Sequence, residues 1–150
     1  EAAAEKGYLR IVEWLHNYAY VFTSEAMNLG AANNRIDVVE WLHFNRAYGG
    51  SEAAMDMAAE NGHLAMVEWL HSNRTEGCTR EAMIMAASNG QLEMVECLHY
   101  NRTEESRATY EALDVAVRKG HLRMVEWLRR KVHCRWQRGY TQIGWRDPPI

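Results

Sequence analysis

Apolar and polar residues alternate along this chain with the spacing of short helices, and the pattern returns about every 28 residues. Its clearest form is the pentapeptide Val-Glu-Trp-Leu-His, which stands at residues 12–16, 39–43 and 67–71 and recurs with one residue changed at 95–99 and 125–129. The second position is always glutamate, and successive glutamates are 27, 28, 28 and 30 residues apart (Glu13, Glu40, Glu68, Glu96 and Glu126). A fixed period of this length predicts a stacked repeat array, one supersecondary unit per period.

The unit from Ser51 to Arg74 predicts two antiparallel helices. Ser51 is the expected N-cap of the first helix, because its hydroxyl can accept a hydrogen bond from a free backbone N–H of the first turn. Asn61-Gly62 is expected to end that helix, since glycine adopts the left-handed conformation at little cost. The second helix is expected to end near Asn73 for the same reason. The apolar residues that predict its buried side are Leu64, Met66, Val67, Trp69 and Leu70.

The other repeats keep this arrangement. The expected N-caps are Thr23, Thr79 and Thr109, and the expected turn residues are Asn34, Gly90 and Gly120. The first repeat starts with only half of a first helix, Glu1–Lys6, which we interpret as a boundary inside a longer array or as a degraded cap.

Small residues explain how such units stack. Paired alanines, such as Ala58-Ala59 and Ala86-Ala87, allow neighbouring helices to approach closely. On the second helices the tryptophans are expected to fill the wider gap (Trp14, Trp41, Trp69 and Trp127). Cys97 takes the tryptophan position in the fourth repeat, so we expect a weaker layer there.

The run Ala-Ala-Glu-Asn-Gly-His-Leu-Ala-Met-Val-Glu-Trp-Leu at 58–70 resembles the second half of an ankyrin repeat, whose familiar pattern is A-A-x-x-G-H-L-x-x-V-x-x-L-L. The match recurs at 86–98 and, more loosely, at 3–15, 31–42 and 116–128. The resemblance implies an all-α solenoid of about five stacked antiparallel helix pairs, with partners bound on the inner helices and the inter-repeat loops. Two departures are the missing T-P-L-H start and a period shorter than the family's roughly 33 residues. We therefore expect short loops and little or no β-hairpin.

Composition suits a folded protein, with 47% hydrophobic and 25% charged residues. The three cysteines fit neither a disulfide framework nor a zinc motif, which favours a reduced, intracellular setting (Cys78, Cys97 and Cys134). Residues 1–117 hold 8 Lys/Arg and 18 Asp/Glu, a net charge of −10, whereas residues 118–150 hold 9 and 2, a net charge of +7. An acidic array with a basic end is typical of chains that carry an interaction segment.

Two repeated polar features need an interpretation. The histidine column after Trp-Leu or Cys-Leu is better explained by the helix C-terminal dipole than by a metal ladder, because repeats stack about 10 Å apart (His16, His43, His71 and His99). His63 and His121 belong to the turn and are expected to be structural. The Asn-Arg pairs at 45–46, 73–74 and 101–102 could read phosphates or carboxylates, but the favoured interpretation is that Asn caps the helix and Arg bonds loop carbonyls or a nearby acid.

Repeats differ most along one face of the first helices, where packing does not dictate the residue. We call nine of these residues the outward stripe and predict that they bind a partner: Glu52, Asp56, Glu60, Arg80, Ile84, Ser88, Tyr110, Asp114 and Arg118. In the second repeat the same face holds Ser24, Asn28 and Ala32. The loops Ala47–Gly50, Thr75–Cys78 and Thr103–Ala108 are expected beside it. Drift on a solvated surface explains the variation about as well.

The segment after Arg129 departs from the pattern, so the chain divides into an ankyrin-like solenoid, 1–129, and a basic and aromatic capping segment, 130–150. Its aromatic residues could stack on single-stranded nucleic acid, but we favour a cap over the apolar flank of the last repeat (Trp136, Tyr140 and Trp145).

The sequence favours a protein–protein interaction module that acts through the concave helix face and the inter-repeat loops. Nucleic-acid binding through the basic end, or service as a targeting arm of a larger enzyme, are the alternatives. No catalytic motif, metal site or cofactor site is predicted, and no apolar run reaches the roughly 20 residues of a membrane span. The partner is therefore expected to be another protein.

Overall fold

The computed structural model describes residues 1–45, 52–75, 77–101 and 106–143, with side chains described up to residue 132 and excluding that of residue 106. These residues form helices only: α1 (Ala2–Lys6), α2 (Leu9–Asn17), α3 (Ser24–Ala32), α4 (Ile36–Phe44), α5 (Glu52–Glu60), α6 (Leu64–Asn73), α7 (Arg80–Ser88), α8 (Leu92–Asn101), α9 (Ser106–Lys119) and α10 (Leu122–Ile143). No strand occurs in the described part, and none of its helices has the length and apolarity that a membrane span requires.

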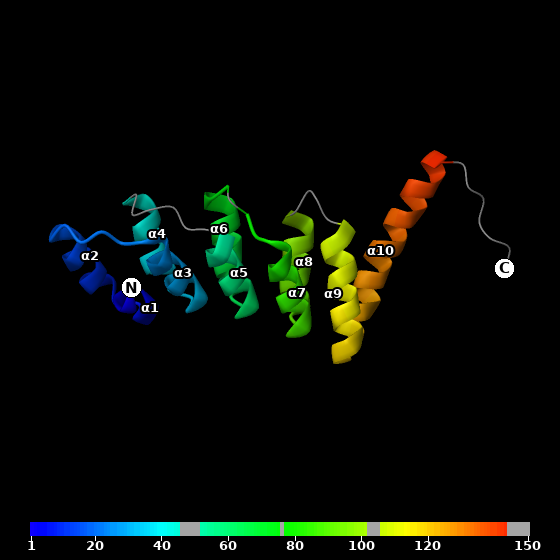
Figure 1. Ribbon diagram of the computed structural model, residues 1–150, viewed down its shortest axis with the longest axis horizontal. Coiled ribbons are helices and arrows are strands. Elements are labelled where there is room, and N and C mark those ends of the chain that lie inside the picture. Colours follow the sequence, from blue (N-terminus) through cyan, green and yellow to red (C-terminus); the bar gives the residue numbers. More distant parts are fainter. Residues whose placement is uncertain (46–51, 76, 102–105, 144–150) are drawn as a thin grey trace.

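The helices pair in chain order, and the pairs stand in a single row with α1 at one end and α10 at the other (Figure 1). We number these pairs repeats 1 to 5. The first helices (α1, α3, α5, α7 and α9) pack directly on one another, and the second helices form a looser layer behind them. The predicted solenoid of five antiparallel helix pairs is therefore confirmed.

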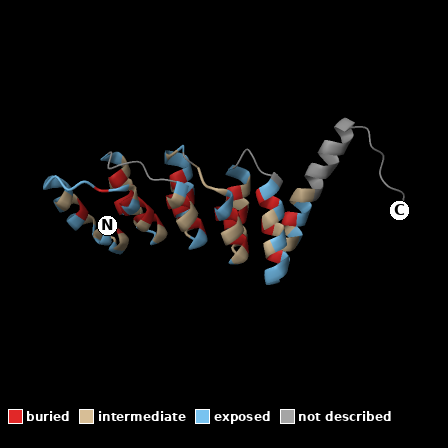
Figure 2. Cartoon of the chain, in the orientation of Figure 1, coloured by how far each residue is buried: buried red, intermediate tan, exposed pale blue. Residues whose placement is uncertain are grey.

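Alanines explain the tighter inner layer. Ala58, Ala59, Ala86 and Ala87 are fully buried, so the backbones of α5 and α7 meet across methyl groups. Figure 2 shows buried residues between the helices of every pair rather than in one central nucleus. Each repeat thus depends on its neighbours for burial.

The predicted turns between paired helices are confirmed. Gly62, Gly90 and Gly120 adopt φ values of 78°, 73° and 76°, and Asn34 adopts 56° in the second repeat. The predicted left-handed ending of the second helices is wrong, because Asn45 has a φ of −86°. Asn45 and Asn73 instead donate side-chain hydrogen bonds of 2.8 Å to the carbonyls four residues earlier. They therefore cap their helices through the amide rather than through the backbone.

Two of the predicted N-caps need correction. Thr79 caps α7, and its hydroxyl accepts from Glu81 N at 3.2 Å. Thr23 precedes α3, but its hydroxyl donates to the Glu1 carboxylate at 2.7 Å and makes no capping bond. Thr109 lies inside α9 and is 4% exposed, because the longer spacing in repeat 5 extends the helix back to Ser106. Ser51 lies outside the described residues.

A second set of contacts joins each turn to the repeat before it. The residue that follows the left-handed turn residue reaches a carbonyl in the last turn of the preceding first helix, where helix carbonyls have no partner of their own. The distances are 3.4 Å from Arg35 Nε to Glu5 O, 3.0 Å from His63 Nε2 to Ala32 O, 3.2 Å from Gln91 Nε2 to Glu60 O and 3.0 Å from His121 Nε2 to Ser88 O. His63 and His121 are therefore structural, as predicted.

The histidine column packs on the tryptophans of the following repeats. His16 meets Trp41 edge to face with ring centroids 5.1 Å apart, and His43 meets Trp69 in the same way at 5.5 Å. The third such contact joins His99 to Trp127 at 5.3 Å. Because aromatic pairs of this geometry are stabilising, the column holds neighbouring repeats together. The predicted role at the helix dipole misses this contact.

The ladder of rings is interrupted where Cys97 replaces tryptophan. Within the described residues His71 has no aromatic partner, and it is exposed. Burial raises the pKa of the Cys97 thiol above its ordinary value, which keeps the sulfur uncharged. Asn101 Nδ2 donates to Cys97 Sγ at 3.3 Å, in place of the carbonyl bond seen in earlier repeats.

The tryptophans are only partly as predicted. Trp41, Trp69 and Trp127 are half-buried against the core. Trp14 is 56% exposed, so the prediction that every indole fills a gap is wrong for repeat 1, where no described helix packs on that side.

Candidate protein-interaction face

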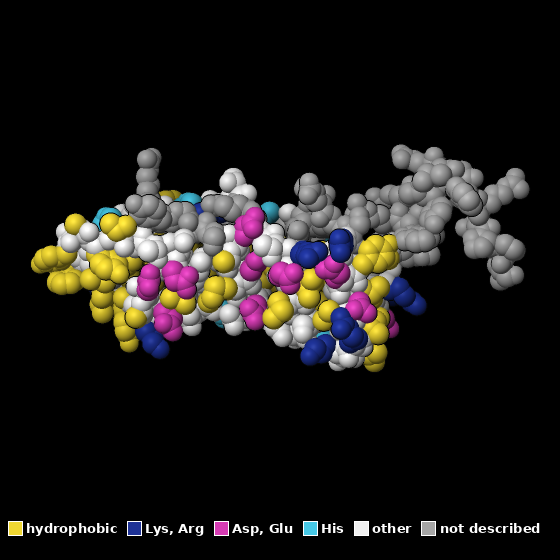
Figure 3. All heavy atoms as spheres, viewed as in Figure 1, with side chains coloured by type: hydrophobic (Ala, Val, Ile, Leu, Met, Phe, Trp, Pro, Cys, Tyr) yellow, Lys and Arg dark blue, Asp and Glu magenta, His cyan; other side chains and the backbone are white. Residues whose placement is uncertain are grey.

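The outward stripe lies on three adjacent first helices, α5, α7 and α9. Figure 3 views the molecule from the side of the first helices and shows acidic side chains in a column over α5, with Lys and Arg side chains gathered toward α9. Glu52, Glu60 and Arg80 are exposed, and Asp56, Ile84 and Ser88 are half-buried. Tyr110, Asp114 and Arg118 on α9 are exposed. The structure thus gathers the predicted residues on one face, although their local roles differ.

Asp56 has a structural role within the stripe. Its Oδ1 accepts from the backbone N–H of Thr79 at 2.8 Å, and its Oδ2 accepts from the Thr79 hydroxyl at 2.7 Å. One carboxylate on α5 therefore fixes the residue that caps α7 in the next repeat. Charge-assisted bonds of this length are stronger than neutral ones. Asp56 joins two repeats, and its carboxylate is already engaged at both oxygens.

We expect replacement of Asp56 by alanine (D56A) to lower the free energy of unfolding by about 1–2 kcal/mol, because two hydrogen bonds to a charged group are lost. Urea denaturation followed by circular dichroism measures this change. The matched control is E52A on the same helix, since Glu52 is exposed and surface changes stay within about 0.5 kcal/mol. Equal effects of the two substitutions would contradict the assigned role.

The charged stripe residues on α7 and α9 are paired within the chain. Arg80 lies 3.6 Å from Glu111 across the two helices and 3.6 Å from its neighbour Glu81. Arg118 Nη2 donates to Asp114 Oδ2 at 2.7 Å. Exposed pairs of this kind contribute little stability, so a partner can rearrange them at small cost.

The acidic positions on α5 are different. In the described part of the chain, no cation pairs with the exposed carboxylates of Glu52 and Glu60. Neither α3 nor α5 carries a lysine or arginine, and α3 adds the exposed Glu25. The half of the face over α3 and α5 is therefore uniformly acidic.

One residue that shares this face in repeat 2 was misplaced by the sequence pattern. Asn28 is 6% exposed and therefore buried, although its repeat position predicts exposure. Asn28 and Asp56 occupy the same position in successive repeats, one whole repeat apart. The position faces the repeat junction, so polar residues there bond inside the array.

Several predicted features fall largely on residues that are not described. The loops Ala47–Gly50 and Thr103–Ala108 lie outside the described residues except for Arg107 and Ala108, as do Arg46 and Arg102 of the Asn-Arg pairs. The side chains of the capping residues Trp136, Tyr140 and Trp145 also lie outside them. Helix α10 continues across the predicted boundary at 129–130. The cap over the last repeat stays a prediction.

Arg74 shows what the arginine of an Asn-Arg pair does. Its Nη1 lies 3.3 Å from Met27 Sδ and 3.4 Å from His43 Nδ1, both in repeat 2. The sequence analysis expected a loop carbonyl or acid as partner. Instead the guanidinium reaches back one repeat and contacts the histidine of the ring ladder.

The repeat spacing could have indicated the junction contacts. Asp56 and Thr79 are a polar pair whose positions recur as Asn28 and Ser51, both times 23 residues apart. The histidine of one repeat and the tryptophan of the next are 25 or 26 residues apart in the first two repeat junctions. Such fixed offsets between different residue types mark contacts between neighbouring repeats.

Comparison with known families gives one match. The family model described as ankyrin repeats (3 copies) matches residues 55–137, which is more than half of the chain. No curated protein matches the sequence.

Proposed function

Because the chain belongs to the ankyrin repeat family, we propose that it binds another protein through the first-helix face and the inter-repeat loops beside it. Ankyrin repeats are in general protein–protein interaction modules and typically not catalytic. The binding residues in this proposal are the outward stripe without Asp56, whose carboxylate serves the fold.

The observation that carries the proposal is the contrast between the two sides of the first helices. Toward the core the same small residue recurs at Ala54, Ala82 and Ala112, and all three are buried. Toward solvent, Glu52, Arg80 and Tyr110 occupy one repeat position and differ in charge and shape. A rigid inner layer that displays different side chains is suited to recognition, since preorganised surfaces lose little entropy on binding.

The charge distribution indicates the partner's chemistry. Glu25, Glu52 and Glu60 are exposed carboxylates on adjacent helices without a neighbouring cation on those helices. Complementary potentials across an interface raise the association rate and select partners. We therefore infer that the partner places Lys or Arg side chains opposite α3 and α5.

The test reverses two of these charges, in the variant E52K/E60K. We expect the variant to capture at least about tenfold less of the proteins that the unmodified chain enriches from a lysate, because like charges then face the partner. Quantitative mass spectrometry of the captured proteins measures the loss.

The control variant E68K/E93K has the same change in net charge. Glu68 and Glu93 are exposed on the second helices, away from the proposed face. Circular dichroism verifies that both variants are folded. If E52K/E60K and E68K/E93K capture the same proteins in the same amounts as the unmodified chain, the first-helix face is not the binding surface.

A further inference from the structure

Every internal repeat junction buries the same positions, so each repeat has two distinct ends. Toward the preceding repeat the second helices bury Val38, Met66, Met94 and Met124, each at most 2% exposed. Toward the following repeat the first helices bury Ala4, Ala31, Ala59 and Ala87, each 0% exposed. These two sets of positions define the leading end and the trailing end of a repeat.

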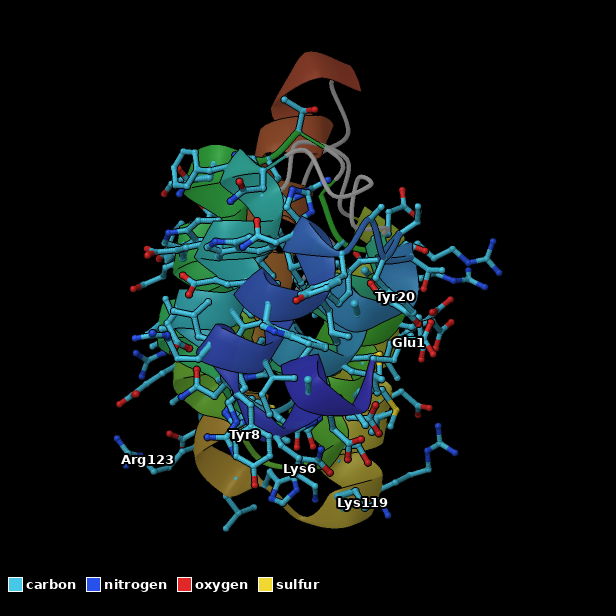
Figure 4. The ribbon with its side chains drawn as sticks, turned by 90° about the vertical axis from the view of Figure 1, so that its left-hand side faces the viewer. Glu1, Lys6, Tyr8, Tyr20, Lys119 and Arg123 are labelled. Carbon is cyan, nitrogen blue, oxygen red and sulfur yellow. The ribbon has the colours of Figure 1, made fainter. Side chains whose placement is uncertain are left out.

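The leading end of repeat 1 is uncovered. Ile11 occupies the position of Val38 and Met66 but is 47% exposed. Trp14 lacks the histidine that covers Trp41 and Trp69, and it is 56% exposed. Tyr8, at the position from which His63 reaches the preceding repeat, is 56% exposed as well. Figure 4 looks onto this end and shows Tyr8 at the outer surface of the first repeat. An apolar patch of this kind marks a binding surface.

The trailing end of repeat 5 is uncovered too. Val117 occupies the position of the buried alanines and is 56% exposed. Val125 is partly exposed, whereas its equivalents Val67 and Val95 are buried. A Cβ atom at Gly120 would meet nothing within 4 Å, whereas at Gly90 it would meet His121 of the next repeat. The space that a following repeat fills inside the array is open here.

We propose that these two ends bind each other, so that a second copy of this chain stacks its repeat 1 onto repeat 5 in the register of the internal junctions. The argument is continuity with an interface that the molecule already builds between its own repeats. In this register Tyr8 of the second copy lies at the open Gly120 turn. Arg129, which is exposed at the histidine position of the ladder, lies over Trp14 of the second copy. Arginine over an indole ring is a favourable cation–π arrangement.

The association is head to tail and does not close. A heterologous contact between the two ends of a straight row leaves one free end on each side, so copies add in line as concentration rises. Val117 is larger than the alanine of the internal junctions, which sets the first helices further apart. The contact is therefore weaker than an internal junction and reversible on dilution. It uses neither the outward stripe nor the proposed partner.

The test measures the mass in solution by sedimentation velocity over a wide concentration range. The mass of the unmodified chain should rise above the monomer as concentration increases. The variants W14E at the leading end and V117E at the trailing end should each stay monomeric, since both place a carboxylate in the contact. I11E is a second leading-end variant. The control A65E adds the same charge at an exposed position of α6 and should associate like the unmodified chain.

Mixing the variants tests the polarity of the contact. W14E keeps an intact trailing end and V117E keeps an intact leading end, so an equimolar mixture should form a dimer and nothing larger. Circular dichroism verifies that each variant is folded. A monomer at every concentration, association that W14E, I11E and V117E leave unchanged, or a mixture that stays monomeric would each overturn the proposal.

Discussion

Replacement of Trp69 by alanine (W69A) is expected to lower the free energy of unfolding by about 2–4 kcal/mol. Truncation of a buried indole costs about 3–5 kcal/mol, and Trp69 is half-buried, which places the effect somewhat lower. The substitution also removes the edge-to-face contact with His43 of the preceding repeat, with ring centroids 5.5 Å apart. Urea denaturation followed by circular dichroism measures the change.

Position 97 gives the complementary experiment, because there the array itself lacks the indole. C97W places a tryptophan beside the exposed His71 and is expected to raise the free energy of unfolding by about 1 kcal/mol, the value of one aromatic pair. The double variant H71A/C97W, compared with H71A alone, should lose most of that gain. If C97W destabilises the chain or stabilises it equally without His71, the ring ladder does not join repeats in the way described.

The second large effect is expected at Gly90. Alanine in the left-handed conformation costs about 1–2 kcal/mol, and Gly90 has a φ of 73°. A Cβ atom there would lie 2.9 Å from Cε1 of His121, so the ring must move and lose its 3.0 Å contact with the Ser88 carbonyl. We therefore expect G90A to lower the free energy of unfolding by about 2–3 kcal/mol.

Gly120 is the matched control for this prediction. Its φ of 76° is nearly the same, but nothing lies within 4 Å of a Cβ atom built on it. G120A is therefore expected to cost only the conformational term of about 1–2 kcal/mol. Chemical denaturation of both variants gives the difference. Equal losses would show that the turn glycines serve backbone conformation alone and not the approach of the next repeat.

The architecture could be predicted from the sequence because the signals repeat. Helical spacing of apolar residues, a turn at Asn61-Gly62 and alanines at fixed positions recur in several repeats, so an irregular residue in one repeat is outweighed by the others. The predicted left-handed turns and the buried methionines at 66, 94 and 124 are confirmed for that reason. A local prediction that rests on one repeat, such as the cap at Thr109, is less secure.

The contacts between repeats could not be predicted from one repeat alone. Asp56 and Glu52 lie on the same helix one turn apart, yet only Asp56 reaches Thr79 of the next repeat. That difference depends on how far α5 and α7 are offset along their axes, which helical periodicity does not specify. The exposure of Trp14 has a similar cause, since its environment is set by what lies beside repeat 1 and not by its own motif.

The outward stripe was predicted from variation between repeats, and the structure divides it by chemistry. Glu52 and Glu60 are exposed carboxylates on an acidic helix, whereas Asp114 and Arg118 pair with each other at 2.7 Å. Variation alone could not separate these groups, because an ion pair and an unpaired charge look the same in sequence. The proposed binding role of both groups stays a prediction until a partner is captured.

The central claim is that the repeated motif encodes contacts between neighbouring repeats, and a pair of double-mutant cycles tests it most directly. The first cycle combines H43A with W69A, whose rings meet across repeats 2 and 3, and the second combines H71A with W69A on the single helix α6. We predict a coupling free energy of about 0.5–1.5 kcal/mol in the first cycle and additivity within about 0.5 kcal/mol in the second. Additivity in both cycles, or equal coupling in both, would contradict the account.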